Sequence, residues 1–303
     1  LLKGNCGIER EMLRVDKNGY LSFTDHPEIF GDKVLNPYIT TDFSESQVEV
    51  ITPALDKIEE TYSFLKALYD IVALEIGDEI LWPQSMPCFI PEDDEIPVAK
   101  YSEEGREAEE YRKKQLISGI HYNYSFNEEI IRKLYESSDK ELTYKEYKNS
   151  IYLKVARNYL RYRWIIVYLL GAAPVIHESF LNGCSCKLKQ ISEDGYTLDG
   201  AVSHRNGECG YRNKEELYPN YDTVEDYVES INKYVNDGVI DSHKELYSQV
   251  RLKAKEPKNF LNSLLEDGIS YLEYRSIDIN PFEKGGISLN DLYFLQLLNI
   301  YAY

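Results

Sequence analysis

The strictest pattern in the sequence is an alternation of apolar and polar residues from Leu116 to Phe126. The apolar side chains fall on one side of this alternation, and the polar ones, among them His121, fall on the other. Successive side chains of a strand point to opposite faces, so the segment predicts a strand with one buried and one polar face. The segment from Tyr271 to Ile279 alternates in the same way, with Glu273 and Arg275 pointing in one direction. The chain must therefore fold around a sheet that carries a polar face.

Helical periodicity predicts the elements that cover the other face of this sheet. Apolar residues recur at helical spacing in four segments: Lys57–Glu75, Tyr144–Leu170, Thr223–Asn236 and Leu289–Tyr301. The stretch from Gly7 to Thr52 reads instead as strands, with a hairpin turn at 17–19 followed by a strand at 20–23. No internal repeat or Gly/Ser linker divides the sequence. We expect one α+β domain over residues 1–303, with a largely antiparallel sheet and packed helices.

The acidic balance of the chain limits its partners. Subtracting 52 acidic from 34 basic side chains gives a net charge of -18, which repels nucleic acid and anionic membranes. The longest apolar run, Trp164 to Ile176, is interrupted by Gly171 and Pro174 and is shorter than the roughly 20 residues that span a bilayer. We expect a small-molecule partner, and a phosphate ligand would have to be carried by cations. The acid-rich run from Glu92 to Glu110 predicts a mobile surface loop that covers a pocket.

The cysteines predict a reducing compartment. There are five, an odd number, and they are spread through a chain that is too large to need disulfides. We therefore expect free thiols and a cytoplasmic location. The pair Cys184 and Cys186 could hold a metal, but no second Cys or His pair stands at zinc spacing, so a loop with two thiols is favoured.

Glu9 and Glu11 are the first candidate site residues. They are two apart in a predicted strand, so both carboxylates project from one face. Two ionised carboxylates at that separation are tolerated on a solvated edge or beside a divalent cation. Taken alone, the pair is better explained as ordinary surface.

Further acids reach the same layer from other parts of the sequence. The segment 40–53 places Glu45, Gln47 and Glu49 on one strand face, whereas Asp42 joins that face only from a turn or a bulge. His121 alone would be a structural histidine, and Glu273 with Arg275 would be a surface ion pair. Acids and one histidine on distant strands match instead the oxygen-rich environment of several magnesium ions.

Common catalytic and nucleotide motifs are missing. The sequence has neither a GxxxxGK[ST] loop nor a GxGxxG turn after a strand, so a glycine loop does not cradle the phosphates. A G-x-S-x-G elbow and an H-E-x-x-H helix are also missing, which disfavours serine hydrolases and zinc proteases. Metal ions must then carry more of the phosphate charge.

Several blocks occur in the same order as in a known family. They are Gly7–Val15, Thr40–Pro53, Leu81–Cys88, Ile117–Asn123, Gly210–Tyr211, Glu245–Tyr247 and Glu273–Phe282. On these blocks nearly the whole chain resembles the bacterial-type glutamate–cysteine ligases, including the form fused to glutathione synthetase. The resemblance implies ATP-dependent ligation of the glutamate γ-carboxyl group to the cysteine amine through γ-glutamyl phosphate, the first step of glutathione synthesis. It also implies a fold similar to the glutamine synthetase catalytic domain.

The resemblance assigns roles to individual residues. The implied metal ligands are Glu9, Glu11, Asp42, Glu49, His121 and Glu273. Arg205 and Arg275 would be catalytic and would contact carboxylate or phosphoryl oxygens, which suits a bidentate guanidinium. Tyr211 and Tyr247 would line the cysteine pocket, Gln115 would lie beside the glutamate, and Arg251 would face the nucleotide. The cofactors would be ATP and Mg²⁺, with Mn²⁺ as the alternative ion.

The family pattern also raises expectations about the extent of the chain. Family members carry a longer segment where Arg112 runs into Lys113 here, and they continue beyond Tyr303; in the fused form a C-terminal ATP-grasp domain follows. We expect a catalytic domain truncated on its C-terminal side. Two alternatives stay open: another ATP-dependent carboxylate–amine ligase on the same scaffold, such as a γ-glutamyl-amine ligase, and an acidic metal-binding module that is not an enzyme.

Overall fold

The main sheet places the N-terminal strand at its centre. A computed structural model describes residues 3–92, 95–100, 112–184, 186–213, 216–256 and 259–303. The strands follow the order β2-β3-β1-β5-β10-β9, and every neighbouring pair is antiparallel. Their bounds are β1 Gly4–Val15, β2 Ile39–Thr41, β3 Gln47–Ile51, β5 Ile120–Phe126, β9 Val250–Lys253 and β10 Tyr271–Ile277. A short strand, β4 (Ile80–Leu81), also pairs with β1. The largely antiparallel sheet of an α+β fold is confirmed.

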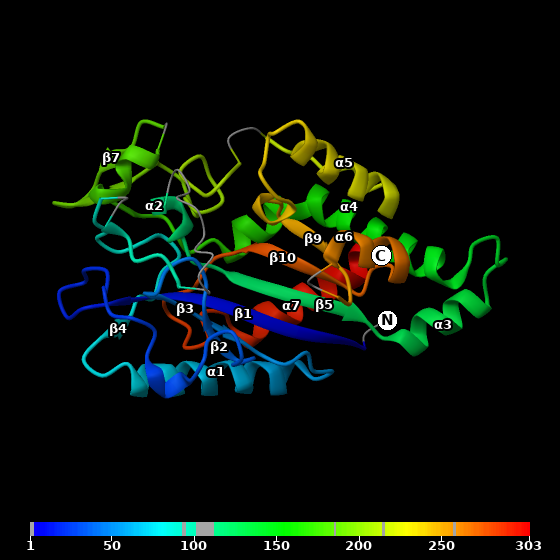
Figure 1. Ribbon diagram of the computed structural model, residues 1–303, viewed down its shortest axis with the longest axis horizontal. Helices are drawn as coiled ribbons and strands as arrows, with labels where there is room; N and C mark the ends of the chain where they lie inside the picture. Colours follow the sequence, from blue (N-terminus) through cyan, green and yellow to red (C-terminus); the bar gives the residue numbers. More distant parts are fainter. Residues whose placement is uncertain (1–2, 93–94, 101–111, 185, 214–215, 257–258) are drawn as a thin grey trace.

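Three helices cover the apolar face of this sheet. They are α1 (Ile58–Glu75), α4 (Tyr144–Leu170) and α7 (Leu289–Ala302), and they pack on the strands and on one another (Figure 1). The apolar side of the alternation is buried as expected, with Tyr122 and Tyr274 at most 1% exposed. The polar side of the same strands faces away from these helices. The sheet therefore presents its polar face to the loops.

The other helices lie at the margins of this core. Their bounds are α2 Arg112–Gln115, α3 Glu128–Glu136, α5 Val224–Asn236 and α6 Phe260–Asp267, with short 3-10 turns at η1 Glu28–Phe30, η3 Glu178–Gly183 and η4 His243–Glu245. Capping explains where the long helices begin: Thr143 and Glu146 form a capping box before α4. All four predicted long helices are present, with ends within one residue of the prediction.

Two predictions near the N-terminus are wrong in detail. The strand expected at 20–23 is reduced to isolated bridges, Val15 with Leu21 and Tyr20 with Phe89. Glu45 does not extend β3: it lies buried in the preceding turn, where it pairs with Lys33. Most of the loop expected at 92–110 lies outside the described residues.

A second, three-stranded sheet lies beside the first. It has the order β6-β8-β7, with β6 Ile176–His177, β7 Lys189–Gln190 and β8 Gly195–Thr197. The segment between β6 and β7 corrects the expectation of free thiols, because Cys184 is joined to Cys209 by a disulfide. Chain folding brings their Cα atoms to 4.5 Å across a separation of 25 residues, which sequence spacing does not reveal.

None of the helices in the part of the chain that the structure describes is both long enough and apolar enough to cross a membrane.

Candidate active site

The register of the central strands brings the predicted acids onto one face. Glu9 lies opposite His121 and Glu11 opposite Glu49 in the two ladders of β1. Glu273 of β10 lies one strand further, opposite Asn123 of β5. Directly opposed residues of an antiparallel pair share a face, so these side chains converge. Their ligand atoms form two groups within 4.8 Å: Glu9, His121 and Glu273 in one, and Glu11, Glu49 and His121 in the other.

His121 lies at the centre of both groups. Its Nδ1 is 3.1 Å from Glu9 Oε2 and 3.8 Å from Glu273 Oε1. Its Nε2 is 3.6 Å from Glu11 Oε1. The imidazole is buried, so it is held between carboxylates rather than exposed to solvent. A histidine with carboxylates next to both ring nitrogens is better explained as a metal ligand than as a structural residue of the core.

The two acids of β1 are held by different partners. Glu9 Oε1 accepts a hydrogen bond of 2.9 Å from Asn123 Nδ2. Burial opposes ionisation of Glu9, but the hydrogen bond with His121 keeps the pKa of this carboxyl below its usual range. Glu11 Oε2 accepts from the backbone N–H of Gly119 at 2.8 Å, and burial raises the pKa of Glu11. Equal spacing on one strand thus gives two different electrostatic environments.

Repulsion between carboxylates is most evident at Glu49. Burial and repulsion from Glu9, Asp42 and Glu11 raise the pKa of Glu49 well above its usual value. Asp42 contributes because β2 ends at Thr41 and Asp42 occupies the bend before β3, the turn position that the sequence required. The layer therefore concentrates more negative charge than its own cations neutralise.

The donor set fits divalent cations. It consists of carboxylate oxygens and one imidazole, which suit Mg²⁺ or Mn²⁺. Within the described part of the chain, the buried Glu273 Oε2 has no hydrogen-bond partner, and Lys253 Nζ stands 3.4 Å from it. An acceptor oxygen of this kind is available to a cation.

Removing the repulsion at Glu49 should stabilise the metal-free protein. Because the pKa of Glu49 is raised in the folded state, the folded chain loses stability as pH rises from the unfolded-state pKa to the folded-state pKa. We expect Glu49→Gln in EDTA to raise the melting temperature by a few degrees at neutral pH, and the gain to vanish in acid. Differential scanning calorimetry across pH measures both effects. A lower melting temperature at neutral pH would contradict the proposed repulsion.

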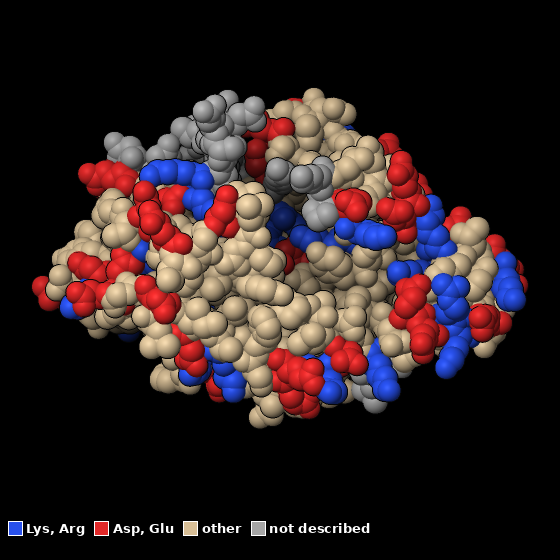
Figure 2. Space-filling view, turned by 60° about the horizontal axis from the view of Figure 1, so that its bottom comes forward, with Lys and Arg blue, Asp and Glu red and all other residues tan. Residues whose placement is uncertain are grey.

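Basic side chains border the acidic layer on the β9 side. Arg251 lies opposite Glu273 in the β9–β10 ladder, and Lys253 contacts Glu273. Burial opposes ionisation of Glu273, but Lys253, Arg275 and Arg251 hold the pKa of its carboxyl far below the usual range. The register between β10 and β5 shifts between Tyr274 and Ile277, and Arg275 lies in this irregular stretch. The Nε of Arg275 is 3.5 Å from His121 Nε2. Figure 2 shows a hollow in which Lys and Arg atoms gather next to acidic ones.

Arg205 reaches the site from a loop outside the sheet. It is 6% exposed, and its positive charge lowers the pKa of Glu11 against the effect of burial. Its guanidinium packs closely against Gly119, where an added Cβ would fall within 3.0 Å of three guanidinium atoms. Arg205 Nη1 is 4.0 Å from Oδ1 of the buried Asp278. Asp278 also accepts a hydrogen bond of 3.2 Å from Asn206, so it positions the loop that carries Arg205.

A cavity of about 320 Å³ opens next to Arg205. Tyr211 and Tyr247 line it, with ring centroids 5.3 Å apart in an edge-to-face arrangement. The Arg275 guanidinium lies 5.5 Å from the centroid of the Tyr247 ring. The cavity thus brings the aromatic residues predicted for a substrate pocket next to Arg205, and Arg275 lies near one of the two rings without lining the cavity.

The structure brings most of the predicted residues together and adds others. The predicted ligands of the sheet share one layer. Asp42 lies in the bend before β3, where its charge raises the pKa of Glu49. Arg251 borders the layer, where its charge lowers the pKa of Glu273. Gln115 is the last residue of α2, and its role stays a prediction.

Sequence reasoning missed four residues of the site: Asn123, Lys253, Gly119 and Asp278. Asn123 was recognisable, because it follows His121 on the polar side of the alternation. The other three act through contacts between distant segments.

Fold and site together define a class: α+β proteins whose antiparallel sheet carries a carboxylate–histidine site suited to divalent cations. A sequence model of the glutamate–cysteine ligase family matches residues 1–238 and 232–303. The chain belongs to the glutamate–cysteine ligase family.

Curated relatives are similar over nearly the whole of this chain. The chain is 45% identical to the bifunctional glutathione biosynthesis protein of Clostridium perfringens and 41% identical to that of Desulfotalea psychrophila. These matches cover 99% and 100% of this chain but 40% and 39% of the relatives. The chain therefore spans about two fifths of the length of these proteins.

Two solved structures share the fold. The bifunctional glutathione synthetase of Pasteurella multocida superposes with a TM-score of 0.85 at 35% identity, covering 99% of this chain and 39% of that one. The glutamate–cysteine ligase of Francisella tularensis, in complex with AMP, superposes with a TM-score of 0.86 at 29% identity, covering 99% of this chain and 66% of that one.

Proposed function

We propose that this chain is the catalytic part of an ATP-dependent glutamate–cysteine ligase, which joins the glutamate γ-carboxyl group to the cysteine amine in the first step of glutathione synthesis. The observation that carries the proposal is the convergence of Glu9, Glu11, Glu49, His121 and Glu273 on one sheet face, bordered by the buried Arg205 and the partly buried Arg251 and Arg275. The proposed substrates, glutamate and cysteine, follow from membership of the family. The AMP complex of the Francisella tularensis enzyme supports a nucleotide site in the same fold.

The proposed metal ligands are Glu9, Glu11, Asp42, Glu49, His121 and Glu273. When bound there, Mg²⁺ or Mn²⁺ would neutralise the phosphates of ATP and the substrate carboxylate so that the two anions can meet. The raised pKa of Glu49 supports this assignment, because it reflects repulsion between carboxylates that a bound cation would relieve. Glu273 Oε2, which has no hydrogen-bond partner, offers a further oxygen ligand.

The side chains of this protein divide the remaining tasks. Arg205 and Arg275, whose charges both lower the pKa of Glu11, would bind the anionic oxygens of the glutamate and of the phosphoryl group in transfer. Transfer of the γ-phosphoryl group to the glutamate γ-carboxyl gives γ-glutamyl phosphate. The cysteine amine then displaces phosphate. Tyr211 and Tyr247 would hold the cysteine in the cavity beside Arg205. Arg251 would face the nucleotide, and Gln115 the glutamate.

The wider setting is part of the same proposal. Residues 1–303 would belong to one catalytic domain with a fold similar to that of glutamine synthetase. Because the chain covers 40% of the Clostridium perfringens relative, a fused glutathione synthetase of the ATP-grasp type fits as a partner domain. A cytoplasmic location would give access to ATP and both amino acids.

Acceptor choice provides the direct test. With glutamate and Mg²⁺-ATP present, we expect cysteine to stimulate phosphate release well above ammonia or other amines, because the aromatic cavity accepts a side chain next to the amine. A coupled phosphate assay measures the rates, and mass spectrometry identifies the dipeptide. Stimulation by another amine but not by cysteine would favour a different γ-glutamyl ligase on this scaffold. An absence of phosphate release and of any melting shift with Mg²⁺-ATP would favour a metal-binding module.

A further inference from the structure

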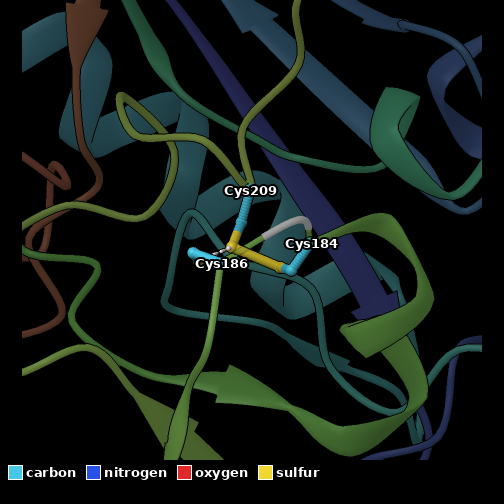
Figure 3. The surroundings of a disulfide bond; sticks show 3 residues. All are labelled: Cys184, Cys186 and Cys209. Carbon is cyan, nitrogen blue, oxygen red and sulfur yellow. Dashed lines mark hydrogen bonds between the residues drawn. A yellow bond between two sulfur atoms is a disulfide. The ribbon is translucent and has the colours of Figure 1, made fainter.

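Three sulfur atoms meet between two loops outside the carboxylate layer. Cys184 and Cys186 follow η3, and Cys209 belongs to the loop that carries Arg205 (Figure 3). Cys184 and Cys209 form the disulfide, and the Sγ of the free Cys186 lies 3.4 Å from the Sγ of Cys209. Cys209 is fully buried, whereas Cys184 and Cys186 are partly exposed. A thiol thus stands in van der Waals contact with a disulfide sulfur.

The two other free cysteines provide a contrast. Cys6 and Cys88 are buried within the hydrophobic cores. Burial raises the pKa of the Cys6 thiol and raises that of Cys88 to about 12. The Cys6 thiol donates a hydrogen bond to Thr61, and the Cys88 thiol donates to the carbonyl of Phe89. Among the free cysteines of the described chain, Cys186 alone combines partial exposure to solvent with a contact to a disulfide sulfur.

We propose that Cys184, Cys186 and Cys209 form a thiol–disulfide exchange centre that reacts with low-molecular-weight thiols. In the internal step, the Cys186 thiolate attacks Cys209 Sγ, the bond to Cys184 breaks, and Cys184 leaves as a thiolate that takes up the proton lost by Cys186. One disulfide is exchanged for another, so this step needs no oxidant.

An external thiol uses the same chemistry at Cys184, the partly exposed cysteine of the disulfide. Attack of its thiolate on Cys184 Sγ gives a mixed disulfide and releases Cys209 as a thiolate. A second thiol molecule then attacks the sulfur of the first, which leaves Cys184 reduced. Two thiol molecules are oxidised to one disulfide, and the protein gains two thiol groups.

The state of the centre acts on the substrate cavity through the loop of Cys209. The next residue, Gly210, packs so closely on the carbonyl of Arg205 that an added Cβ would fall within 3.0 Å of it. Tyr211 follows and lines the cavity together with Arg205. A covalent bond at Cys209 therefore restrains the loop segment from which the Arg205 and Tyr211 side chains reach the cavity. This link to catalysis rests on the proposed function, in which a substrate and its product are themselves thiols.

Disulfide mapping tests the centre without reference to catalysis. The purified protein would be quenched in acid, alkylated and mapped by peptide mass spectrometry, alongside Cys186→Ser and the control Cys88→Ala, which removes a buried thiol outside the centre. We expect both the Cys184–Cys209 and the Cys186–Cys209 linkages in the parent and in Cys88→Ala. In Cys186→Ser we expect the first linkage alone.

Reaction with free thiols tests the external partner. With millimolar L-cysteine or reduced glutathione, we expect reduction of the parent to be at least about ten-fold faster than that of Cys186→Ser, because the internal exchange presents a second disulfide to solvent. The KM for cysteine should differ between the oxidised and the reduced parent. A single linkage in the parent with equal reduction rates in both proteins would overturn the proposal. So would one Zn²⁺ bound per chain by the three sulfurs of the purified protein. Correct mapping in a protein without ligase activity would reject the function and leave the centre standing.

Discussion

Under the proposed function, replacing Glu9 by Gln is expected to abolish ligase turnover and to leave the fold intact. Both oxygens of Glu9 are engaged, Oε1 by Asn123 Nδ2 at 2.9 Å and Oε2 by His121 Nδ1 at 3.1 Å. The amide retains the size of the side chain and its bond to Asn123, but it removes a negative charge and places an N–H₂ group toward His121. Loss of one preorganised electrostatic contact costs about 10²–10³ in kcat, and we expect a loss at least this large here. Steady-state phosphate release measures the effect.

Two further measurements separate a site effect from unfolding. Glu129→Gln makes the same chemical change at an exposed position of α3 and should retain parental activity. Mg²⁺-ATP should raise the melting temperature of the parent and of Glu129→Gln, and it should raise that of Glu9→Gln much less. Near-normal turnover in Glu9→Gln would remove this residue from the proposed ligand set.

Alternation of side chains made the carboxylate layer predictable. The period of two in β5 and β10 assigns His121 and Glu273 to polar faces, and the same period assigns Glu9 and Glu11 to one face of β1. What the period does not give is strand order. Spacing assembled these residues as candidates for one layer, and family resemblance selected the same set, before the ladders showed them to be neighbours.

The failures of the sequence-based predictions share a physical cause. Glu45 was assigned to the acidic face by extending the period of β3 through a turn, where the period no longer holds. Cys184 and Cys209 are 25 residues apart and meet only because two loops pack together. Asp278 and Lys253 act on residues of other segments. Contacts of this kind depend on tertiary packing, which local pattern does not encode.

Gly119 offers a second test, because a side chain at this position would displace Arg205. The Arg205 guanidinium occupies the space where a Cβ of residue 119 would stand. We expect Gly119→Ala to displace the guanidinium from the carboxylate layer and to lower kcat/KM by about 10²-fold, the cost of a misplacement of about 1 Å. Gly7→Ala is the matched control: it lies in β1 of the same sheet, and its added Cβ would meet Ala54 Cα at an ordinary 3.6 Å.

A double-mutant cycle distinguishes this account from a general disturbance of the sheet. If Gly119 acts by leaving room for Arg205, then Gly119→Ala should cost little in a protein that already carries Arg205→Ala, because the displaced group is gone. Additive losses would show instead that the methyl group acts by another route, of which the nearest is the backbone N–H of Gly119 that bonds Glu11. The coupling between the two substitutions therefore measures how strongly the close contact of Gly119 with the Arg205 guanidinium determines the position of Arg205.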